Sequence, residues 1–315
     1  MGVDWERWRT RRRSSHSWGH RVRRQPENTR DMPRSYVPLP LIAIVLILVL
    51  AGCSAPLPWP DSPLHDLPAT DPNWRPPESL QEAMEAIQGR YAHYDVVSYE
   101  EETEQTTLRT MVVSYGYTEF RIVDGKLYEI DTFCRAEQKL NQKGVTSLFR
   151  DAAVQAIEPR ETEVELTFRD GQWHIYRPPT PTLLGINGDP ALPLPMDPND
   201  PNLTDPDDDG HPGVTVELDI GGFMKAELYI TRREIYEYYL TLNSDGNLYG
   251  RVVDSSEQFV VGATMRTLRQ QSNPDQIGDP GMNPIMLIRV DDSLDTCEEL
   301  AAVRDDLFPA TPDFQ

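Results

Sequence analysis

The stretch Leu166-Thr167-Phe168-Arg169-Asp170-Gly171-Gln172-Trp173-His174-Ile175-Tyr176, or LTFRDGQWHIY, decides the fold class. Apolar and polar residues alternate on both sides of Asp170-Gly171, and an Asp-Gly pair between alternating runs is the strongest short-range signal of a β-hairpin. A two-residue loop pairs Phe168 with Trp173 and Leu166 with Ile175 on one face, and Thr167 with His174 on the other. His174 is therefore predicted on a polar face, as a surface histidine.

Two more Asp-Gly turns lie between alternating runs. In YYLTLNSDGNLYGRVV, residues 238–253, a three-residue loop ending at Gly246 aligns Leu242 with Leu248 and Tyr238 with Val252. That register favours a type I turn with a glycine bulge. Asp124-Gly125, between FRIV and LYEI, predicts a third hairpin whose register the sequence leaves open.

The remaining pattern is also mainly β. Alternation over 214–220 and 259–265 predicts strands with one wet face, and residues 285–288 predict a more fully buried strand. Short helices are predicted near each end, one over 79–88 begun by Ser79 and Glu82, the other begun by Asp295 and Glu298 and carrying Cys297, Leu300, Ala301 and Phe308. About a dozen strands at hairpin spacing predict a mainly β fold, an antiparallel meander forming a barrel or sandwich.

The approach to the first strand bears on what such a barrel could hold. A helix leading into Gly89-Arg90-Tyr91 and an up-and-down meander resembles a lipocalin, with Tyr where that family has Trp. The other motifs of the lipocalin family are missing from this sequence. It implies an interior cavity for a small apolar ligand.

An apolar run precedes all of this. Residues 41–50 are uninterrupted apolar residues, which is the length of an export signal and too short for a membrane span. The residues that follow, Leu50-Ala51-Gly52-Cys53, resemble the lipobox of bacterial lipoproteins at every position. The resemblance implies that the signal is removed and that Cys53 is lipidated. The acyl chains on Cys53 then anchor the protein to a membrane. Ser54, where Asp would retain a lipoprotein in the inner membrane, implies the outer membrane, at its periplasmic or surface face.

Composition changes divide the chain. We expect residues 1–31 to be a basic extension, non-native or cytoplasmic, because Met32 begins a complete signal over 32–52. Translation is expected to start at Met32, and a start at Met1 is the alternative. A Pro-rich tether over 53–77 leads to a first β lobe over 78–178. Ten prolines in residues 178–212 mark a Pro/Asp-rich linker over 179–212. A second β lobe with the C-terminal helix follows over 213–315.

Charge excludes one class of partner. The chain has a formal net charge of −21, and from Cys53 onward it has 20 basic and 47 acidic residues, a net charge of −27. Phosphate backbones are repelled by such a surface, so nucleic-acid binding is not expected.

The chain has three cysteines, and Cys53 is not available for a disulfide if it is lipidated. Cys134 and Cys297 then remain in a compartment where disulfides persist, and we predict that they pair. Two separate buried thiols are the alternative.

The linker contains a possible metal loop, Asp205-Pro206-Asp207-Asp208-Asp209-Gly210-His211. It resembles the Asp-x-Asp-x-Asp-Gly loops of EF-hands and thrombospondin type 3 repeats, which implies calcium held by Asp205, Asp207 and Asp209 and by the His211 carbonyl. The twelfth position is Val216 where an EF-hand has a bidentate Glu. A solvated acidic turn is the alternative.

Known catalytic motifs are absent from the sequence, and the histidines after Cys53 lie far apart in it. The expected function is therefore a lipid-anchored, non-catalytic β-protein of the cell envelope, acting as a binding or structural module for a small ligand or a partner protein. The alternatives are an envelope hydrolase whose site requires the fold, and a calcium-stabilised adhesion module.

Overall fold

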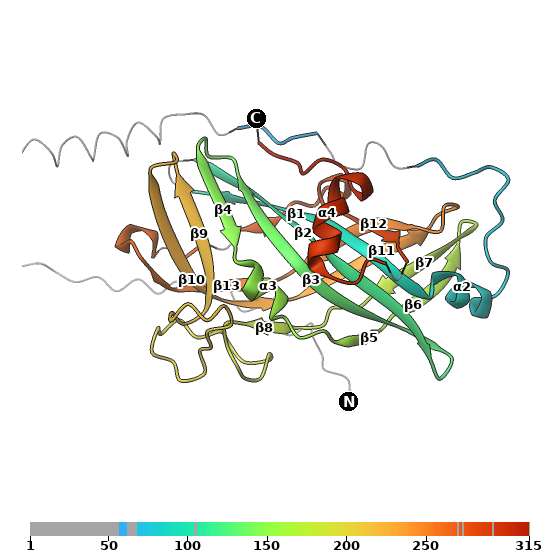
Figure 1. Ribbon diagram of the computed structural model, residues 1–315, viewed down its shortest axis with the longest axis horizontal. Coiled ribbons are helices and arrows are strands. Elements are labelled where there is room, and N and C mark those ends of the chain that lie inside the picture. Colours follow the sequence, from blue (N-terminus) through green and yellow to red (C-terminus); the bar gives the residue numbers. More distant parts are fainter. Residues whose placement is uncertain are drawn as a thin grey trace, which may run out of the picture. The chain divides into compact units, whose positions relative to one another are not determined.

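Fifteen strands of one antiparallel sheet dominate the computed structural model, which describes residues 57–61, 68–103, 106–269, 271–272, 274–291 and 293–314 (Figure 1). The mainly β prediction is confirmed, and the sheet curls into a half-barrel. The strands are β1 (Gly89–Glu102), β2 (Thr107–Val123), β3 (Lys126–Leu140), β4 (Val145–Phe149), β5 (Glu161–Glu163), β6 (Glu165–Arg169), β7 (Gln172–Arg177), β8 (Thr182–Leu184), β9 (Val214–Ile220), β10 (Met224–Glu234), β11 (Tyr236–Leu242), β12 (Leu248–Asp254), β13 (Glu257–Ala263), β14 (Asp275–Gln276) and β15 (Pro284–Arg289).

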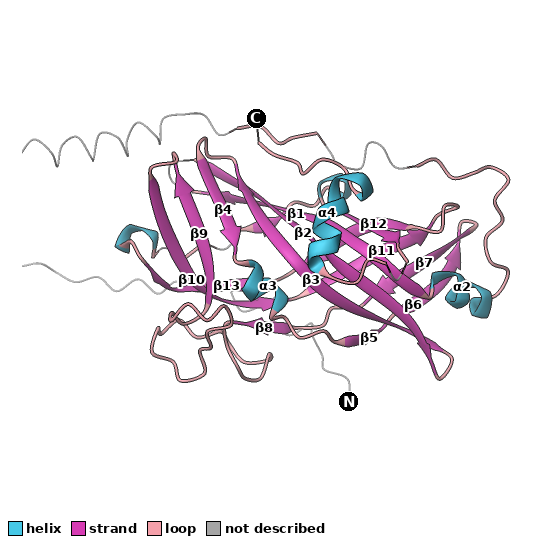
Figure 2. Ribbon diagram, in the orientation of Figure 1, coloured by secondary structure: helices cyan, strands magenta, loops and turns pink. Residues whose placement is uncertain are grey.

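Helices are few and short (Figure 2). They are α2 (Leu80–Ile87), α3 (Asp151–Gln155), α4 (Cys297–Leu307) and the 3-10 turns η2 (Arg266–Leu268) and η3 (Pro280–Met282). Ser79 caps α2 as predicted, because its side chain accepts from the Glu82 amide. The capping pair predicted for α4 is wrong by one residue: Thr296 and Glu299 form the capping box, since the Thr296 hydroxyl, unlike Asp295, reaches the N3 amide.

Strands from both sides of the Pro/Asp-rich linker lie in the same sheet. Its order is β13-β10-β9-β4-β3-β2-β1-β15-β12-β11-β7-β6, so β9 pairs with β4 and β15 with β1. The linker itself contributes β8, which pairs with β10. The two predicted lobes therefore share one sheet.

The Asp-Gly hairpins form with the predicted registers. Phe168 lies opposite Trp173 and Leu166 opposite Ile175 in one, and Leu242 opposite Leu248 and Tyr238 opposite Val252 in the other. In the third hairpin, whose register the sequence left open, a two-residue loop pairs Val123 with Lys126. Asp124 and Gly125 both have positive φ, the conformation of a type I′ turn.

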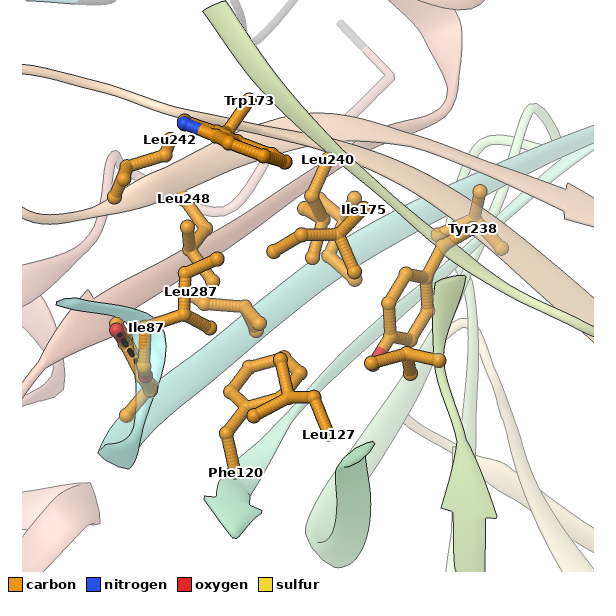
Figure 3. Close-up of a cluster of buried hydrophobic side chains, with 14 of the residues drawn as sticks. Ile87, Phe120, Leu127, Trp173, Ile175, Tyr238, Leu240, Leu242, Leu248 and Leu287 are labelled. Carbon is orange, nitrogen blue, oxygen red and sulfur yellow. Dashed lines mark hydrogen bonds between the residues drawn. The ribbon is translucent and has the colours of Figure 1, made fainter. Parts of the chain in front are cut away.

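The concave face of the sheet is filled by large apolar side chains (Figure 3). Leu240, Leu248, Ile285 and Leu287 come from the middle strands, and Phe120 and Leu127 reach them from the end of the β2–β3 hairpin. The curl brings these distant strands together, since β5 pairs with β3 and runs through Val164 directly into β6. The inner space is therefore a packed core at this end.

The convex face carries a second core, covered by α4 and the C-terminal tail. Ala92, Tyr94 and Val96 of β1 pack there with Leu300 and Phe308. The predicted disulfide is confirmed: Cys134 on β3 bonds Cys297 at the start of α4, with Cα atoms 5.3 Å apart. Because both of its faces are covered, β1 is buried along most of its length.

Part of the segment predicted as a tether lies against this body. The Leu57 amide donates to the Asn141 carbonyl (3.3 Å), and the Trp59 ring packs on Phe314 with centroids 5.4 Å apart. Further along, the Trp173 indole donates to the Pro77 carbonyl (2.8 Å). The described residues of this segment thus belong to the folded unit.

Candidate functional site: a buried charge cluster and an outer groove

The inner face of β1 places two titratable residues, His93 and Asp95, inside the curl. His93 Nε2 lies 2.9 Å from Asp95 Oδ2, and His93 Nδ1 lies 2.8 Å from the Thr118 hydroxyl. Thr118 in turn donates to Asp131 Oδ1 (2.5 Å), which sits opposite it on β3. All four side chains are buried. One histidine is thus held between two carboxylates in a low-dielectric interior.

The hydrogen bonds favour a charged His93, although burial also raises the pKa of its partner Asp95. Thr118 uses its only proton on Asp131, so its oxygen can only accept from Nδ1, and Nε2 donates to Asp95. Burial alone would lower the pKa of His93, but the hydrogen bonds to Asp131 and Asp95 outweigh burial and raise it to about 10. His93 is therefore an imidazolium at neutral pH, with no lone pair for work as a general base.

A second buried pair continues the cluster towards β7. Arg177 Nε donates to Glu129 Oε1 (2.7 Å), and the Arg177 guanidinium lies over the Tyr236 ring, 4.2 Å from its centroid. The Tyr236 hydroxyl donates to Asp131 Oδ2 (2.7 Å), which links the pair to His93. Burial raises the pKa of Glu129 to about 8 despite Arg177, while the hydrogen bond and charge of His93 overcome burial and lower the pKa of Asp131.

The cavity beside this cluster is small. It has a volume of about 40 Å³ and is lined by His93, Asp95, Arg232, Glu234 and Asp254 among others. Arg232 contacts Glu234 and lies 3.7 Å from Asp254, so its charge is balanced. A space of this size holds a few water molecules. The cluster therefore cross-links β1, β2 and β3 through buried hydrogen bonds.

The outer face of β6, β7, β11 and β12 carries an open groove instead. Its volume is about 410 Å³. One row across the strands is Tyr176, Tyr239 and Arg251, successive partners in the register. The two rings stack with centroids 5.0 Å apart, and the Arg251 guanidinium lies 5.0 Å from the Tyr239 centroid. This row makes a stacked ladder with a cation at one end.

The next row of the groove is Thr167, His174 and Thr241. His174 lies on the predicted polar face, and its Nδ1 is 3.0 Å from the Thr241 hydroxyl. Burial and the charge of Arg169 lower the pKa of His174, so this imidazole is neutral at neutral pH. Both phenol hydroxyls of the ladder donate to Glu237, which fixes the rings. The groove thus combines neutral polar groups and the cations Arg169 and Arg251 with one carboxylate, Glu237, which is held by the two phenol hydroxyls.

The structure brings the predicted metal ligands together. One oxygen each from Asp205, Asp207 and Asp209 lies within 4.8 Å of the others. Arg150 enters the same place, with Nη1 2.7 Å from Asp209 Oδ2 and 4.0 Å from Asp207 Oδ2. The His211 ring stacks on Tyr229, with centroids 4.2 Å apart. A guanidinium therefore supplies positive charge to the acidic cluster.

The buried cluster of His93, Asp95 and Asp131 was not predicted from the sequence, and some of the sites that were predicted are not among the described residues. Cys53 and the whole signal segment lie outside the described residues. None of the helices in the described part of the chain is long and apolar enough to span a membrane. Comparison of the chain with protein-family models, with curated proteins and with solved structures finds no match.

Proposed function

We propose that this protein is a lipid-anchored, non-catalytic binding module of the bacterial cell envelope, held at the outer membrane by a lipid on Cys53. The lipobox-like Leu50-Ala51-Gly52-Cys53 supports the anchor. The protonated His93 supports a binding role over hydrolysis, since an imidazolium fixed between two carboxylates is a poor base. No cofactor is required for this role.

The outer groove is the observation that carries the binding role. Within the described residues, neither Arg169 nor Arg251 forms an ion pair, although the chain is strongly acidic. Two cations beside a stacked ladder favour a ligand with a carboxylate or phosphate group, because guanidinium forks match those anions. A ligand body that packs against Tyr176 and Tyr239 completes the fit.

Two measurements test the proposal. Mass spectrometry of the native amino terminus should show a diacylated or triacylated Cys53; an unmodified Cys53 or a retained Leu50 overturns the anchor. Calorimetry with inorganic phosphate and with a galacturonic-acid oligomer should give heat that Arg251→Gln removes and that Arg121→Gln, at an exposed arginine elsewhere, keeps. No heat with either probe, or equal heat in both variants, overturns the groove.

A calcium-stabilised module is the second candidate, favoured by Asp207. Its side chain is 0% exposed, and Oδ1 has no hydrogen-bond partner among the described residues. Because Arg150 already balances the cluster, affinity should lie in the millimolar range typical of weak extracellular sites. Calcium should then raise the melting temperature of the wild type and of the Asp208→Asn control but not of Asp207→Asn. No shift in the wild type overturns this candidate.

A further inference from the structure

We propose that the end of the sheet made by the β3–β4 and β9–β10 hairpins faces the membrane, with the Phe223 side chain in the headgroup region of a zwitterionic bilayer. The inference rests on the proposed lipid at Cys53 and adds an orientation to it. Three observations carry it: the place where the anchor segment meets the body, the exposure of Phe223, and the charged residues around it.

The anchor segment meets the body at this end. Leu57 is held to Asn141 through its amide and to Arg109 through its carbonyl, which accepts from Nη1 (3.3 Å). Asn141 directly follows β3 and precedes the turn to β4. Cys53 is four residues before Leu57, and four extended residues span at most about 14 Å. A lipid on Cys53 therefore keeps this end of the sheet close to the bilayer.

Phe223 stands at the tip of the adjacent hairpin. It is 78% exposed, more than any other large apolar residue described. The two hairpins are joined, because the Gly221 amide donates to the Gly144 carbonyl (2.6 Å). Gly221 and Gly222 have positive φ, and a Cβ on Gly221 would lie 2.5 Å from the Phe223 ring. The tip is thus a tight turn that displays one aromatic ring beside the anchor end.

Charges near the tip favour neutral headgroups. Three of the four lysines in the chain are Lys139, Lys143 and Lys225, all on these two hairpins, where their stems can reach headgroup level. The run Glu100-Glu101-Glu102 ends β1 at the same end of the sheet and opposes them. Attraction to anionic lipid therefore does not drive the contact of this end with the bilayer. Insertion of the aromatic ring at the membrane interface does.

This orientation places the outer groove away from the bilayer. The groove strands β11 and β12 join the sheet through β15, which pairs with the Tyr91–Asp95 half of β1. The β3–β4 turn instead follows Leu140, level with Thr110 and the far half of β1. At the opposite end, the tip residue Val123 is separated from Thr107 by the length of β2, roughly 50 Å for 17 residues.

The experiment compares two environment-sensitive labels on the full-length lipidated protein in phosphatidylcholine vesicles. The label is attached to Phe223→Cys or, as the matched control, to Val123→Cys, which is also exposed at a hairpin tip. The Cys134–Cys297 disulfide and the acylated Cys53 leave one reactive thiol in each variant. We expect a blue shift and quenching by a lipid-borne quencher at position 223, and neither at position 123.

The outcomes separate the anchor from the orientation. If the protein floats with the vesicles and Cys53 is acylated, but the label at 223 stays in water or both labels respond equally, the orientation is overturned and the anchor stands. If Cys53 is unmodified and the protein does not float, the anchor and the orientation both fall. A label at Phe168→Cys, on the exposed β6–β7 hairpin, should also stay in water; a blue shift there places the groove at the bilayer and overturns the orientation.

Discussion

Arg177 Nε and Glu129 Oε1 lie 2.7 Å apart inside the curled sheet, and the two side chains are 5% and 0% exposed. Arg177 also donates to the Tyr236 carbonyl (2.8 Å), so one guanidinium connects β7, β3 and the start of β11. Arg177 also supplies positive charge to the nearby Asp131, whose pKa is lowered, and a buried carboxylate is costly to leave without a cation.

Arg177→Met should therefore lower the free energy of unfolding by about 3–5 kcal/mol, because it removes the cation beside the ionised Asp131 and the hydrogen bonds to Glu129 and the Tyr236 carbonyl. The control is Arg121→Met, which breaks the exposed pair with Glu119 and should cost at most about 1 kcal/mol. Urea unfolding followed by circular dichroism measures both. A loss in Arg177→Met no larger than in the control would show that the buried pair is not a structural cross-link.

Stability should fall as pH rises from neutrality to alkaline values. The pKa of His93 is raised from 6.5 to about 10 by its carboxylate partners, so the proton it binds on folding stabilises the protein below its unfolded pKa, and this contribution is lost as pH passes through 10. Glu129, with a pKa raised to about 8, changes stability in the same direction.

Urea midpoints measured between about pH 7 and 10 test this, with His93→Gln as the comparison. The variant should be less stable at neutral pH and should show a shallower decline, because it lacks the group with the higher pKa. Equal slopes in the two proteins would mean that His93 does not gain a proton on folding.

Local pairing could be predicted from the sequence because its signals are local. The Asp170-Gly171 turn has a defined loop length, so Phe168 had to face Trp173. The disulfide was predictable because Cys134 and Cys297 are the cysteines that remain after Cys53. Strand order was not, since β15 inserts between β1 and β12 through pairings that join residues nearly 200 apart.

The buried cluster around His93 was not predicted, because its residues have the alternating pattern of a strand with one solvent-exposed face. His93 and Asp95 alternate with Ala92 and Tyr94, and such alternation normally places the polar residues in water. Here α4 covers the apolar face and the curl of the sheet buries the polar one. The available signal was Asp124-Gly125, because a two-residue loop there sets Thr118 directly opposite Asp131.

Loss of the disulfide should release the cover of the convex face. The bond closes a loop with a sequence separation of 163, and the chain-entropy estimate for such a loop is about 5 kcal/mol. We expect the Cys134→Ala/Cys297→Ala variant to melt well below the wild type, and a reducing agent to lower the melting temperature of the wild type alone. Unchanged melting in the double variant would mean that α4 is held by Leu300 and Phe308 packing without help from the bond.

Gly250 on β12 lies where a side chain would meet the backbone of β11 beside the groove. A Cβ at this position would lie 1.7 Å from the Tyr239 carbonyl oxygen, and backbone cannot move aside as a flexible side chain can. Gly250→Ala should therefore cost about 1–3 kcal/mol through overpacking. It should also weaken binding in the groove, because separating the strands displaces Tyr239 and Arg251.

Gly278→Ala is the matched control, since a Cβ there meets nothing within 4 Å. It should leave both the urea midpoint and the binding heat near the wild-type values. Equal stability of the two alanine variants would show that β11 and β12 can separate without cost. The close approach of these strands would then not set the spacing of the Tyr176, Tyr239 and Arg251 ladder.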